Sequence, residues 1–529
     1  MSIENAAEGG TVTALGALDP DQAAFEFSTM DPSAAYSPQA LSILVGLVTR
    51  SLTQYVYDPE QDTMVLVPDL ATDLGTPNAD FTQWTYRIRD GVKFEDGTEV
   101  TADDVAYGIK RSFDRRNFKD GPEYSNNFFL DGDTYQGPDT SGTQYDGVKV
   151  EGDTLILKME RPFPDMPYWG AFPAMGPIPE RESDPATYGR HPLATGPYKF
   201  EEFTPKESLT LVRNEEWDPD TDPGRHAYPD RYVFKFTERW EHIDELILGD
   251  FEAGRTTISL SGVLGEDLAE AQDLERLVVG SGPCTFMWYP DNRKITEIEV
   301  RHALGYALPY AGVAKALGLT AGITELHGTS ILPPGHPGRR VYNPLDVEPG
   351  ATDPEKAKAL LREAGYAPGE YEIVFASYPG QSIPEKVFVK SLEDAGFKAT
   401  PFPVPEKDVY RVATDPDAPT NLRINGWCSD WPSGGSWFPP LFHSDRQISD
   451  GPYFAEPAVD AEIERIETLP FEDQPAAWGA LDETIMTDYY PVIVNRYQAV
   501  PVLHGSRIGG VNVDQNLAMP IWKDIYVIP

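Results

Sequence analysis

Cysteine is almost missing from this chain: Cys284 and Cys428 are the two cysteines among 529 residues. Two cysteines cannot build a disulfide framework or a four-cysteine metal site. A single long-range disulfide is compatible with the sequence, and it would favour an exported protein, because disulfides persist in oxidising compartments. Two free buried thiols are the alternative.

Basic residues are also few. The chain has 43 Lys and Arg against 85 Asp and Glu, which gives a net charge of −42. A surface of this sign repels phosphate backbones and anionic lipid headgroups, so nucleic acid is not an expected partner. The simplest interpretation is the solubility of an exposed or salt-tolerant protein.

Long apolar segments are absent too. No run of about 18 apolar residues occurs, so the sequence predicts no membrane-spanning helix. The first twenty residues lack a positively charged segment followed by an apolar one, so no signal peptide is visible there. We therefore expect either a cytosolic protein or a sequence that begins after a removed signal.

The common catalytic motifs are missing. The sequence contains no HExxH, no Walker loop, no GxGxxG and no GxSxG. The closest pair among its eight histidines, His327 and His336, lies in a Pro- and Gly-rich loop without metal-ligand spacing. With 85 carboxylates, pairs of acids occur by chance and do not indicate a glycosidase. We expect no catalytic residue, no metal and no cofactor.

Turn-forming and apolar residues, in contrast, are plentiful. The chain has 49 Pro and 45 Gly, which suits a long, loop-rich globular protein. Hydrophobic residues make up 40% and aromatic residues 11%, which is enough for a large core and excludes disorder. At roughly 150 residues per domain, we expect about two to four domains.

The first readable unit is a strand, a turn and a capped helix over 81–114. Trp84, Tyr86 and Ile88 alternate as on a half-buried strand, and a turn follows. Thr101 is the expected N-cap of a helix, with Asp104 three residues on. Further on, 194–217 predicts two short strands after a Gly-Pro turn.

Two later segments predict alternating helix and strand. The segment 291–317 is predicted to be helical, with Ile298, His302, Gly305 and Leu308 forming a rough stripe. In 353–404 an N-cap, Asp353, opens a helix, and strand, helix and strand follow at short spacing. This alternation predicts an α/β fold with a parallel, doubly wound sheet.

The segment 425–442 is the one most rich in chemistry. It places Trp427, Trp431 and Trp437 around Asp430. One interpretation is a core strand that ends in a loop, with the tryptophans as packing and Asp430 as a turn residue. The other is an aromatic pocket whose carboxylate faces a cationic or hydrogen-bond-donating ligand.

At this point the chain resembles a known family, the large solute-binding proteins of peptide and nickel ABC importers. The resemblance extends nearly from end to end. It rests on two long segments, YRIRDGVKFEDGTEVTADDVAYGIKRSFD and ATGPYKFEEFTPKESLTLVRNEEW, and on the shorter EVRHALGYAL, DPEKAKALLREAGY and GWCSDW.

The resemblance implies a periplasmic-binding-protein-like fold with two lobes, a hinge crossed twice, and an extra inserted domain beside lobe I. Lobe I would comprise 1–45, 185–278 and 495–529, the inserted domain 46–184, and lobe II 279–494. Ligand would be enclosed between the lobes by hinge closure. Members of the family are exported to the periplasm or the outer face of the cell membrane, and in Gram-positive bacteria they are usually lipid-anchored, which would account for a signal missing from this sequence.

The same resemblance assigns site residues. Relatives that bind oligopeptides place an aspartate after Trp-Cys-x, where it pairs with the ligand's amino terminus, and Asp430 matches that position. They also bridge the motif's cysteine to one early in lobe II, which implies a disulfide between Cys428 and Cys284. Met287 and Asn495, on the two predicted hinge crossings, are weaker candidates for ligand contact.

One departure from the family pattern bears on specificity. Oligopeptide binders can carry an arginine three positions before the motif's tryptophan, available for ligand carboxylates, and here that position is Ile424. Arg423 is adjacent but points to the opposite face of a strand.

The function that the sequence predicts is therefore that of a monomeric, non-catalytic binding protein that delivers a peptide or peptide-like molecule to an ABC permease. A ligand alternative is a small aromatic amine, amide or hydrazide-like compound, which the three tryptophans and the missing arginine favour. The alternatives of another class are a peptide or glycoside hydrolase, which the missing motifs disfavour, and a sensory or chaperone-like surface protein on the same fold.

Overall fold

The structure, a computed structural model, describes residues 6–17, 28–379 and 384–529. The chain divides into two compact units. Unit 1 comprises Met1–Gly280 and Val500–Pro529, and unit 2 comprises Ser281–Ala499. The chain passes from one unit to the other twice, within strand β12 (Leu277–Pro290) and within strand β17 (Ile493–Leu503).

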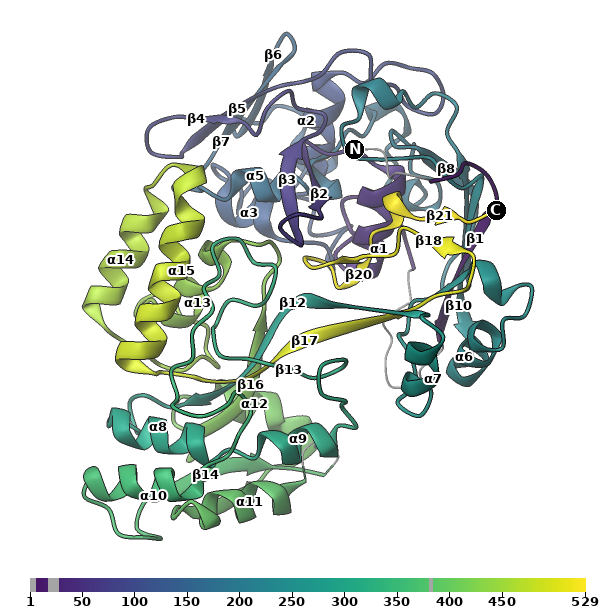
Figure 1. The fold of residues 1–529 in the computed structure, drawn as a ribbon. Helices are drawn as coiled ribbons and strands as arrows, with labels where there is room; N and C mark the ends of the chain where they lie inside the picture. The colour runs from purple at the N-terminus through teal and green to yellow at the C-terminus, as the bar shows by residue number, and fades with distance from the viewer. Residues whose placement is uncertain (1–5, 18–27, 380–383) are drawn as a thin grey trace. The chain divides into compact units, whose positions relative to one another are not determined.

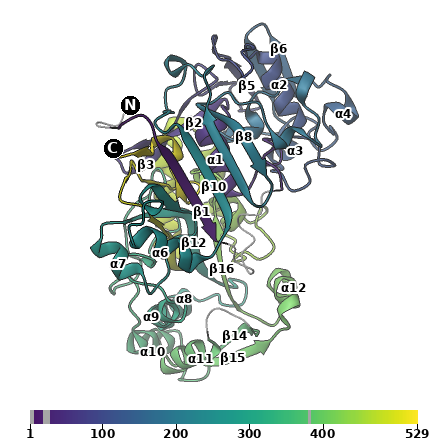
Figure 2. The same cartoon turned by 90° about the vertical axis from the view of Figure 1, so that its right-hand side faces the viewer.

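Unit 1 is built around a five-stranded sheet in the order β11-β1-β10-β9-β8. Strand β1 pairs in parallel with β10 and β11, whereas β10, β9 and β8 pair antiparallel. Figure 2 shows β1 beside β10 in this sheet. The five strands are β1 (Thr11–Ala17), β8 (Tyr198–Thr204), β9 (Ser208–Arg213), β10 (Arg231–Glu238) and β11 (Thr257–Ser259).

The second part of unit 1 holds the strand–turn–helix segment that the sequence predicted. Strand β5 (Gln83–Arg87) buries Trp84 and Tyr86, as their alternation requires. Helix α2 (Ala102–Arg111) begins with a capping box, in which Thr101 accepts from the Asp104 N–H and the Asp104 carboxylate accepts from the Thr101 N–H. The prediction for this segment is confirmed.

The remaining strands of unit 1 form small sheets. A four-stranded sheet has the order β4-β5-β7-β6, and β2 pairs with β3 in a hairpin. Their bounds are β2 (Thr53–Asp58), β3 (Thr63–Pro68), β4 (Thr76–Pro77), β6 (Val148–Glu151) and β7 (Thr154–Lys158).

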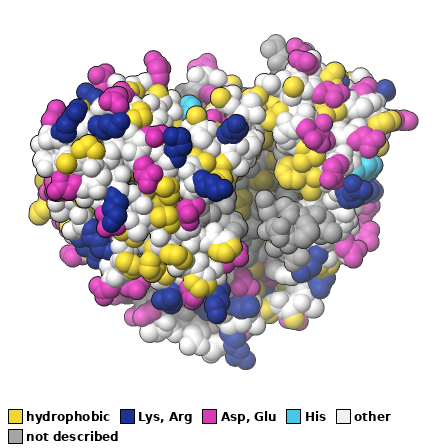
Figure 3. All heavy atoms as spheres, turned by 90° about the horizontal axis from the view of Figure 1, so that it is seen from below, with side chains coloured by type: hydrophobic (Ala, Val, Ile, Leu, Met, Phe, Trp, Pro, Cys, Tyr) yellow, Lys and Arg dark blue, Asp and Glu magenta, His cyan; other side chains and the backbone are white. Residues whose placement is uncertain are grey.

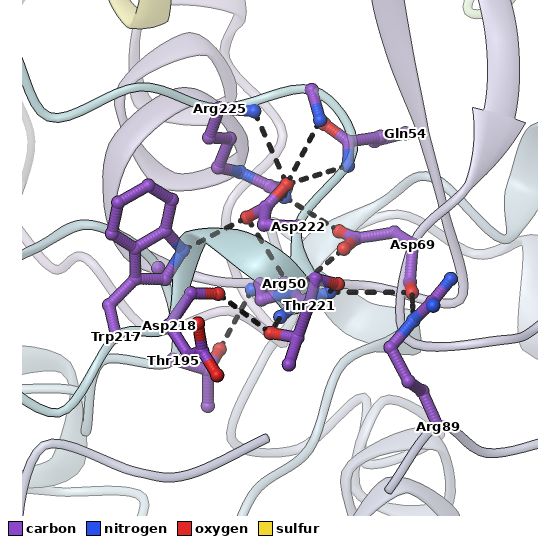
Figure 4. A network of polar contacts seen from close by, with 12 residues as sticks. Arg50, Gln54, Asp69, Arg89, Thr195, Trp217, Asp218, Thr221, Asp222 and Arg225 are labelled. Carbon is purple, nitrogen blue, oxygen red and sulfur yellow. Dashed lines mark hydrogen bonds and ion pairs between the residues drawn. The ribbon is translucent and has the colours of Figure 1, made fainter. Parts of the chain in front are cut away.

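A buried network of charged groups joins distant segments of unit 1 (Figure 4). The Arg50 guanidinium donates to Asp69 at 2.7 Å and to the backbone oxygen of Thr221 at 2.7 Å. Arg225 donates to Asp69 at 2.8 Å and to Asp222 at 3.1 Å. The two arginines and two aspartates are essentially inaccessible to water, so this network fixes 50–69 against 217–225. The first of these segments belongs to the predicted inserted domain and the second to predicted lobe I.

Unit 2 contains a six-stranded sheet in the order β13-β17-β12-β16-β14-β15. Strands β14 and β15 are parallel, and β16 joins β14 in parallel through one pair, Phe375 and Leu422. The parallel pairing predicted from 353–404 is confirmed for β14 and β15, whereas β16 is antiparallel to β12. Strands β12 and β17 carry the chain between the units. The other strands are β13 (Leu326–His327), β14 (Glu372–Ser377), β15 (Lys398–Pro403) and β16 (Leu422–Cys428).

Helices of unit 2 form two groups beside this sheet (Figure 1). The first group is α8 (Ile298–Ala307), α9 (Tyr310–Ala316), α10 (Pro354–Glu363) and α11 (Glu385–Asp394). The second is α13 (Phe438–Phe442), α14 (Pro457–Glu467) and α15 (Gln474–Thr484). Both groups contribute to one large apolar core.

The helix that opens 353–404 forms as predicted, with the Asp353 side chain accepting from the Lys356 N–H and Gly365 in the left-handed region after the last turn. The segment 291–317, which the sequence predicts to be helical, contains the two helices α8 and α9. Pro309 separates α8 from α9, because proline lacks the N–H that a continuing helix would need. Ile298 and His302 are only partly buried, whereas Val300, Ala303 and Leu304 fill the core.

Acidic side chains are spread over the face of the chain that Figure 3 shows. On the face shown in Figure 3, Asp and Glu are interspersed with Lys and Arg, and apolar side chains also reach the surface. The excess of carboxylates therefore does not gather in a single patch on that face. No helix of the described residues has the length and apolar character needed to cross a membrane.

Candidate ligand-binding site

Strand β16 ends at the residues that the sequence singled out. It pairs antiparallel with β12, and Cys428 lies directly opposite Cys284. The two cysteines form the expected disulfide, with Cα atoms 4.0 Å apart. The disulfide anchors the end of β16, from which 429–437 continues as a turn and a short 3₁₀ segment.

The sheet around β16 has two different faces. Strand geometry places Cys284, Phe286, Ile424 and Cys428 on one side, which we call face A, because residues opposite each other in an antiparallel pair share a side. Met287 and Trp427 lie on the other side, face B. Thr285 of face B donates to the backbone oxygen of Ile331, so the loop after β13 covers face B.

Most of the predicted ligand contacts are buried. Met287 and Trp437 are fully buried, Trp431 is 4% exposed and Asn495 is 6% exposed. Trp437 belongs to the core cluster, and the ring of Trp478 occupies the space that a side chain on Gly434 would need. These four side chains pack as core residues in the structure, and their contact with ligand stays a prediction.

Trp427 and Asp430 are the members of the set that reach solvent. Trp427 is half-buried, and its indole N–H donates to the backbone oxygen of Ser436 at 2.8 Å, which fixes the ring against the following turn. Asp430 is partly exposed in that turn. An oriented indole and a partly exposed carboxylate suit a ligand that has an apolar part and a cationic or N–H-donating part.

The departure from the family pattern is clear in the structure. Ile424 is 46% exposed on face A. Arg423 points to face B, where its guanidinium lies 4.6 Å from the ring centre of Tyr453 and 3.8 Å from the carboxylate of Asp291. Burial lowers the pKa of Arg423. Arg423 is therefore engaged in the core and does not replace the missing arginine at 424.

A cavity of about 110 Å³ lies beside Ile424, where β14 and β16 separate beyond their single pair. Helix α12 (Val409–Thr414) forms one wall. The lining is mostly apolar: Phe375, Ala376, Tyr378, Val409, Val412, Ala413, Thr420, Leu422, Arg423 and Ile424. The Thr420 hydroxyl is buried without a hydrogen-bond partner.

Asp482 of α15 is a buried carboxylate that the sequence did not single out. It accepts from the N–H groups of Ile331 and Leu332 and from the Tyr342 hydroxyl. Burial raises the pKa of Asp482 to about 6, although these hydrogen bonds oppose the increase. Asp482 thereby holds the loop that covers face B. No spacing in the sequence could have revealed this, since its partners lie about 150 residues away.

Arg496 of β17 is a second residue that the sequence did not single out. It follows the predicted contact Asn495, so it points to face A, and its guanidinium carbon lies 3.7 Å from the ring centre of Phe286. Alternation along the predicted strand could have indicated its direction, but only the sheet order brings it to Phe286.

A metal site is not evident in the described part of the chain. Within it, no group of three or more His, Cys, Asp or Glu side chains is arranged to hold a metal ion. His327 and His336, which the sequence placed in one loop, have different surroundings: His327 lies near Glu325 at 3.7 Å, and burial lowers the pKa of His336 to about 4.

Relatives of known name match much of the chain. The probable peptide ABC transporter periplasmic-binding protein y4tO of Sinorhizobium fredii is 25% identical over 347 residues, which are 60% of this chain and 58% of that protein. The glutathione-binding protein GsiB of Escherichia coli O157:H7 is 22% identical over 455 residues, which are 80% of each chain.

Solved structures have the same fold. The clavulanic acid biosynthesis oligopeptide binding protein 2 superposes with a TM-score of 0.83 at 23% identity, covering 99% of this chain and 96% of the other. The periplasmic murein tripeptide binding protein MppA, in its unliganded open form, gives a TM-score of 0.79 at 17% identity, covering 99% and 98%. The predicted two-lobed α/β fold is confirmed by these neighbours.

The family model described as bacterial extracellular solute-binding proteins, family 5 Middle, matches residues 65–449. This match includes β5, α2, the first helix group of unit 2 and the segment from β16 to Trp437. It extends over more than half of the sequence, and the predicted resemblance is thereby confirmed. The chain belongs to the bacterial extracellular solute-binding proteins of family 5.

Proposed function

We propose that this protein is the extracellular substrate-binding component of an ABC importer, and that it captures a peptide or peptide-like molecule and delivers it to a membrane permease. The observation that carries the proposal is the family match over 65–449, within which Asp430 follows a strand anchored by the Cys284–Cys428 disulfide. The names of the relatives, which refer to peptide and glutathione, support a ligand of this class.

In this proposal Asp430 pairs with the ligand's ammonium group, and Trp427 forms an aromatic wall beside it. A carboxylate that leaves water on ligand binding needs a cationic or N–H-donating partner, and an ammonium provides both. Trp431, Trp437, Met287 and Asn495 stay predicted contacts, and their burial means that they would reach a ligand only if the turn after β16 or the loop over face B moved.

A second candidate ligand is a small aromatic amine, amide or hydrazide-like compound. This ligand is favoured by the apolar side chain of Ile424 and the mostly apolar cavity beside it. A peptide carboxylate bound there would need a cation at position 424. The proposed role in transport is the same for either ligand.

Several further properties belong to the same proposal. The protein would be non-catalytic, monomeric and held at the outer face of the membrane by a lipid anchor, or periplasmic. Division of unit 1 into lobe I and an inserted domain of 46–184, with lobe II as 279–494, stays a prediction. So does hinge closure around the ligand, which would lower the radius of gyration in small-angle scattering.

Mass spectrometry of small molecules released by gentle unfolding of the purified full chain tests the proposed function. We expect a peptide, whose re-addition raises the melting temperature with concentration, as binding to the folded state requires. An aromatic amine would favour the second candidate. A protein that releases no ligand, and whose melting temperature no peptide or amine changes, would contradict both.

A further inference from the structure

A row of side chains crosses face A of the unit 2 sheet. His327 of β13 lies directly opposite Arg496 of β17. Arg496 reaches over Phe286 of β12, and Phe286 lies opposite Gly426 of β16. The row therefore links β17 to the strand that ends at the disulfide and continues to Asp430. Gly426 has no side chain, and the Phe286 ring packs against its backbone, where a Cβ would lie 3.3 Å from the ring.

The Arg496 guanidinium lacks the partners that a half-buried charge requires. Among the described residues, no carboxylate forms an ion pair with it, and its Nε is buried without a hydrogen-bond acceptor. Burial lowers the pKa of Arg496, and the negative charge of Glu325 only partly opposes that shift. The buried Arg50 and Arg225 of unit 1, in contrast, are paired with aspartates. An unsatisfied buried charge is costly, so an acceptor from outside the chain is expected.

Two neighbours of Arg496 on the same face share this property. Gln498, two residues further along β17, points the same way, and its Oε1 is buried without a donor. The His327 Nδ1 is also buried without a hydrogen bond, and the Glu325 carboxylate lies 3.7 Å from it. A guanidinium that can donate two parallel hydrogen bonds, with an amide and an imidazole beside it, is a set suited to a carboxylate.

We propose that Arg496, held on the Phe286 ring, binds the terminal carboxylate of a peptide ligand. It would replace the arginine that relatives can carry at the position of Ile424. This inference rests on the proposed function, because it assumes a peptide whose ammonium group lies at Asp430. The planar guanidinium matches a carboxylate in a way that a lysine ammonium does not.

The strand spacing favours a short peptide. Asp430 lies four residues beyond Gly426, which is opposite Phe286 on the neighbouring strand. An extended peptide covers about 3.3–3.6 Å per residue, so a ligand of a few residues suits this arrangement.

The test uses the full chain and two synthetic pools: tripeptides randomised at every position, with a free carboxylate or with a C-terminal amide. Affinity is measured by titration calorimetry and by the melting-temperature shift. The wild-type protein should bind the free-acid pool on the order of tenfold to a hundredfold more tightly than the amide pool.

Two substitutions then isolate the guanidinium. Arg496→Met keeps an apolar stem over Phe286 and should remove the preference for the free acid without weakening binding of the amide pool. Arg496→Lys keeps the positive charge and should show only part of the preference for the free acid. It also provides a test if the methionine variant does not fold. Arg362→Met, at an exposed position of α10, removes the same charge and should behave as wild type.

The outcomes separate the inference from the proposed function. Equal binding of both pools by the wild-type protein, or a preference that Arg496→Met retains, would overturn the role of Arg496 while the peptide function stands. A wild-type protein that binds neither pool would overturn both. A preference lost in Arg496→Met and kept in Arg362→Met supports the inference.

Discussion

Two aspartates, one in each unit, are buried to the same degree and have opposite pKa shifts. Burial by itself raises the pKa of a carboxyl, but at Asp222 of unit 1 the guanidinium groups of Arg225 and Arg50 outweigh it, and the pKa falls well below its usual range. At Asp482 of unit 2 the partners are N–H groups and a hydroxyl, and burial raises the pKa to about 6. Charged partners therefore stabilise the ionised form of Asp222, whereas the contacts of Asp482 are mainly hydrogen bonds and do not outweigh its burial.

This difference between Asp222 and Asp482 shows that the partners of a buried charged residue indicate its role. The unit 1 network is complete, since each carboxylate meets two arginines and the Arg50 donors are used. Its role is to join segments. In unit 2, no carboxylate among the described residues forms an ion pair with the half-buried Arg496, and its Nε has no hydrogen-bond acceptor. We expect incomplete pairing of this kind at a ligand-binding surface.

The largest effect should come from breaking the unit 1 network. Arg50→Met leaves Asp69 and Asp222 buried with one arginine in place of two, and breaking such a group costs roughly 3–5 kcal/mol of unfolding free energy. Denaturant unfolding measures this loss. The control Arg87→Met breaks the exposed pair with Asp153 and should cost less than about 1 kcal/mol. Equal losses in the two variants would contradict the structural role of the network.

Removal of the disulfide should destabilise unit 2 and spare unit 1, since both cysteines lie in unit 2. The bond joins residues 144 positions apart, and replacing both with serine typically costs roughly 2–4 kcal/mol. Hydrogen exchange resolves the loss by region: protection should fall for β12 and β16 and persist for β1 and β10. Two titratable thiols in the folded, unreduced wild-type protein would show that the bond does not form.

Asp430 adds a third aspartate to the comparison, one that we expect to pair with the ligand's ammonium group. Asp430→Asn keeps the shape and removes the charge, so affinity for the free-acid tripeptide pool should fall on the order of tenfold to a hundredfold, or about 1.5–3 kcal/mol. The melting temperature without peptide should hardly change. Asp445→Asn, at an exposed position, serves as the control. A lower melting temperature with intact affinity would identify Asp430 as a structural residue instead.

The smallest effect is a pH dependence from Asp482. Its pKa is raised from 3.8 to about 6 by folding, so the folded state holds the proton more tightly than the unfolded state between these values. The contribution of Asp482 to stability is therefore present at low pH and is lost as the pH rises toward and through 6, with a slope of at most about 1.4 kcal/mol per pH unit.

Comparison with Asp482→Asn isolates this term from the other titrating groups. The stability of wild type relative to the variant should increase as the pH falls from 7 to 5, in denaturant unfolding at each pH. A difference that stays constant over this range would show that Asp482 keeps an ordinary pKa in the fold. Asp222→Asn should show no such dependence over the same range, because the pKa of Asp222 is lowered.

The sequence by itself determined the local elements whose signals lie within a few residues. Thr101 and Asp104, and Asp353 with its proline, fix the starts of their helices because a capping side chain satisfies backbone N–H groups only two or three residues ahead. The sequence also placed Trp427, Cys428 and Asp430 together at the end of a strand, and its resemblance to the family correctly implied the disulfide.

Tertiary structure decided which neighbours these elements meet. Cys284 and Cys428, Arg496 and Phe286, and Asp482 and Ile331 are pairs that no local pattern connects, because sheet order and loop packing bring them together over separations of about 140 to 210 residues. The same packing buried Trp437 and Met287, since a tryptophan or methionine fills a core as readily as it faces a ligand. Composition and spacing give the chemistry of a side chain, but its exposure and its partners depend on which strand lies beside it and which loop covers it.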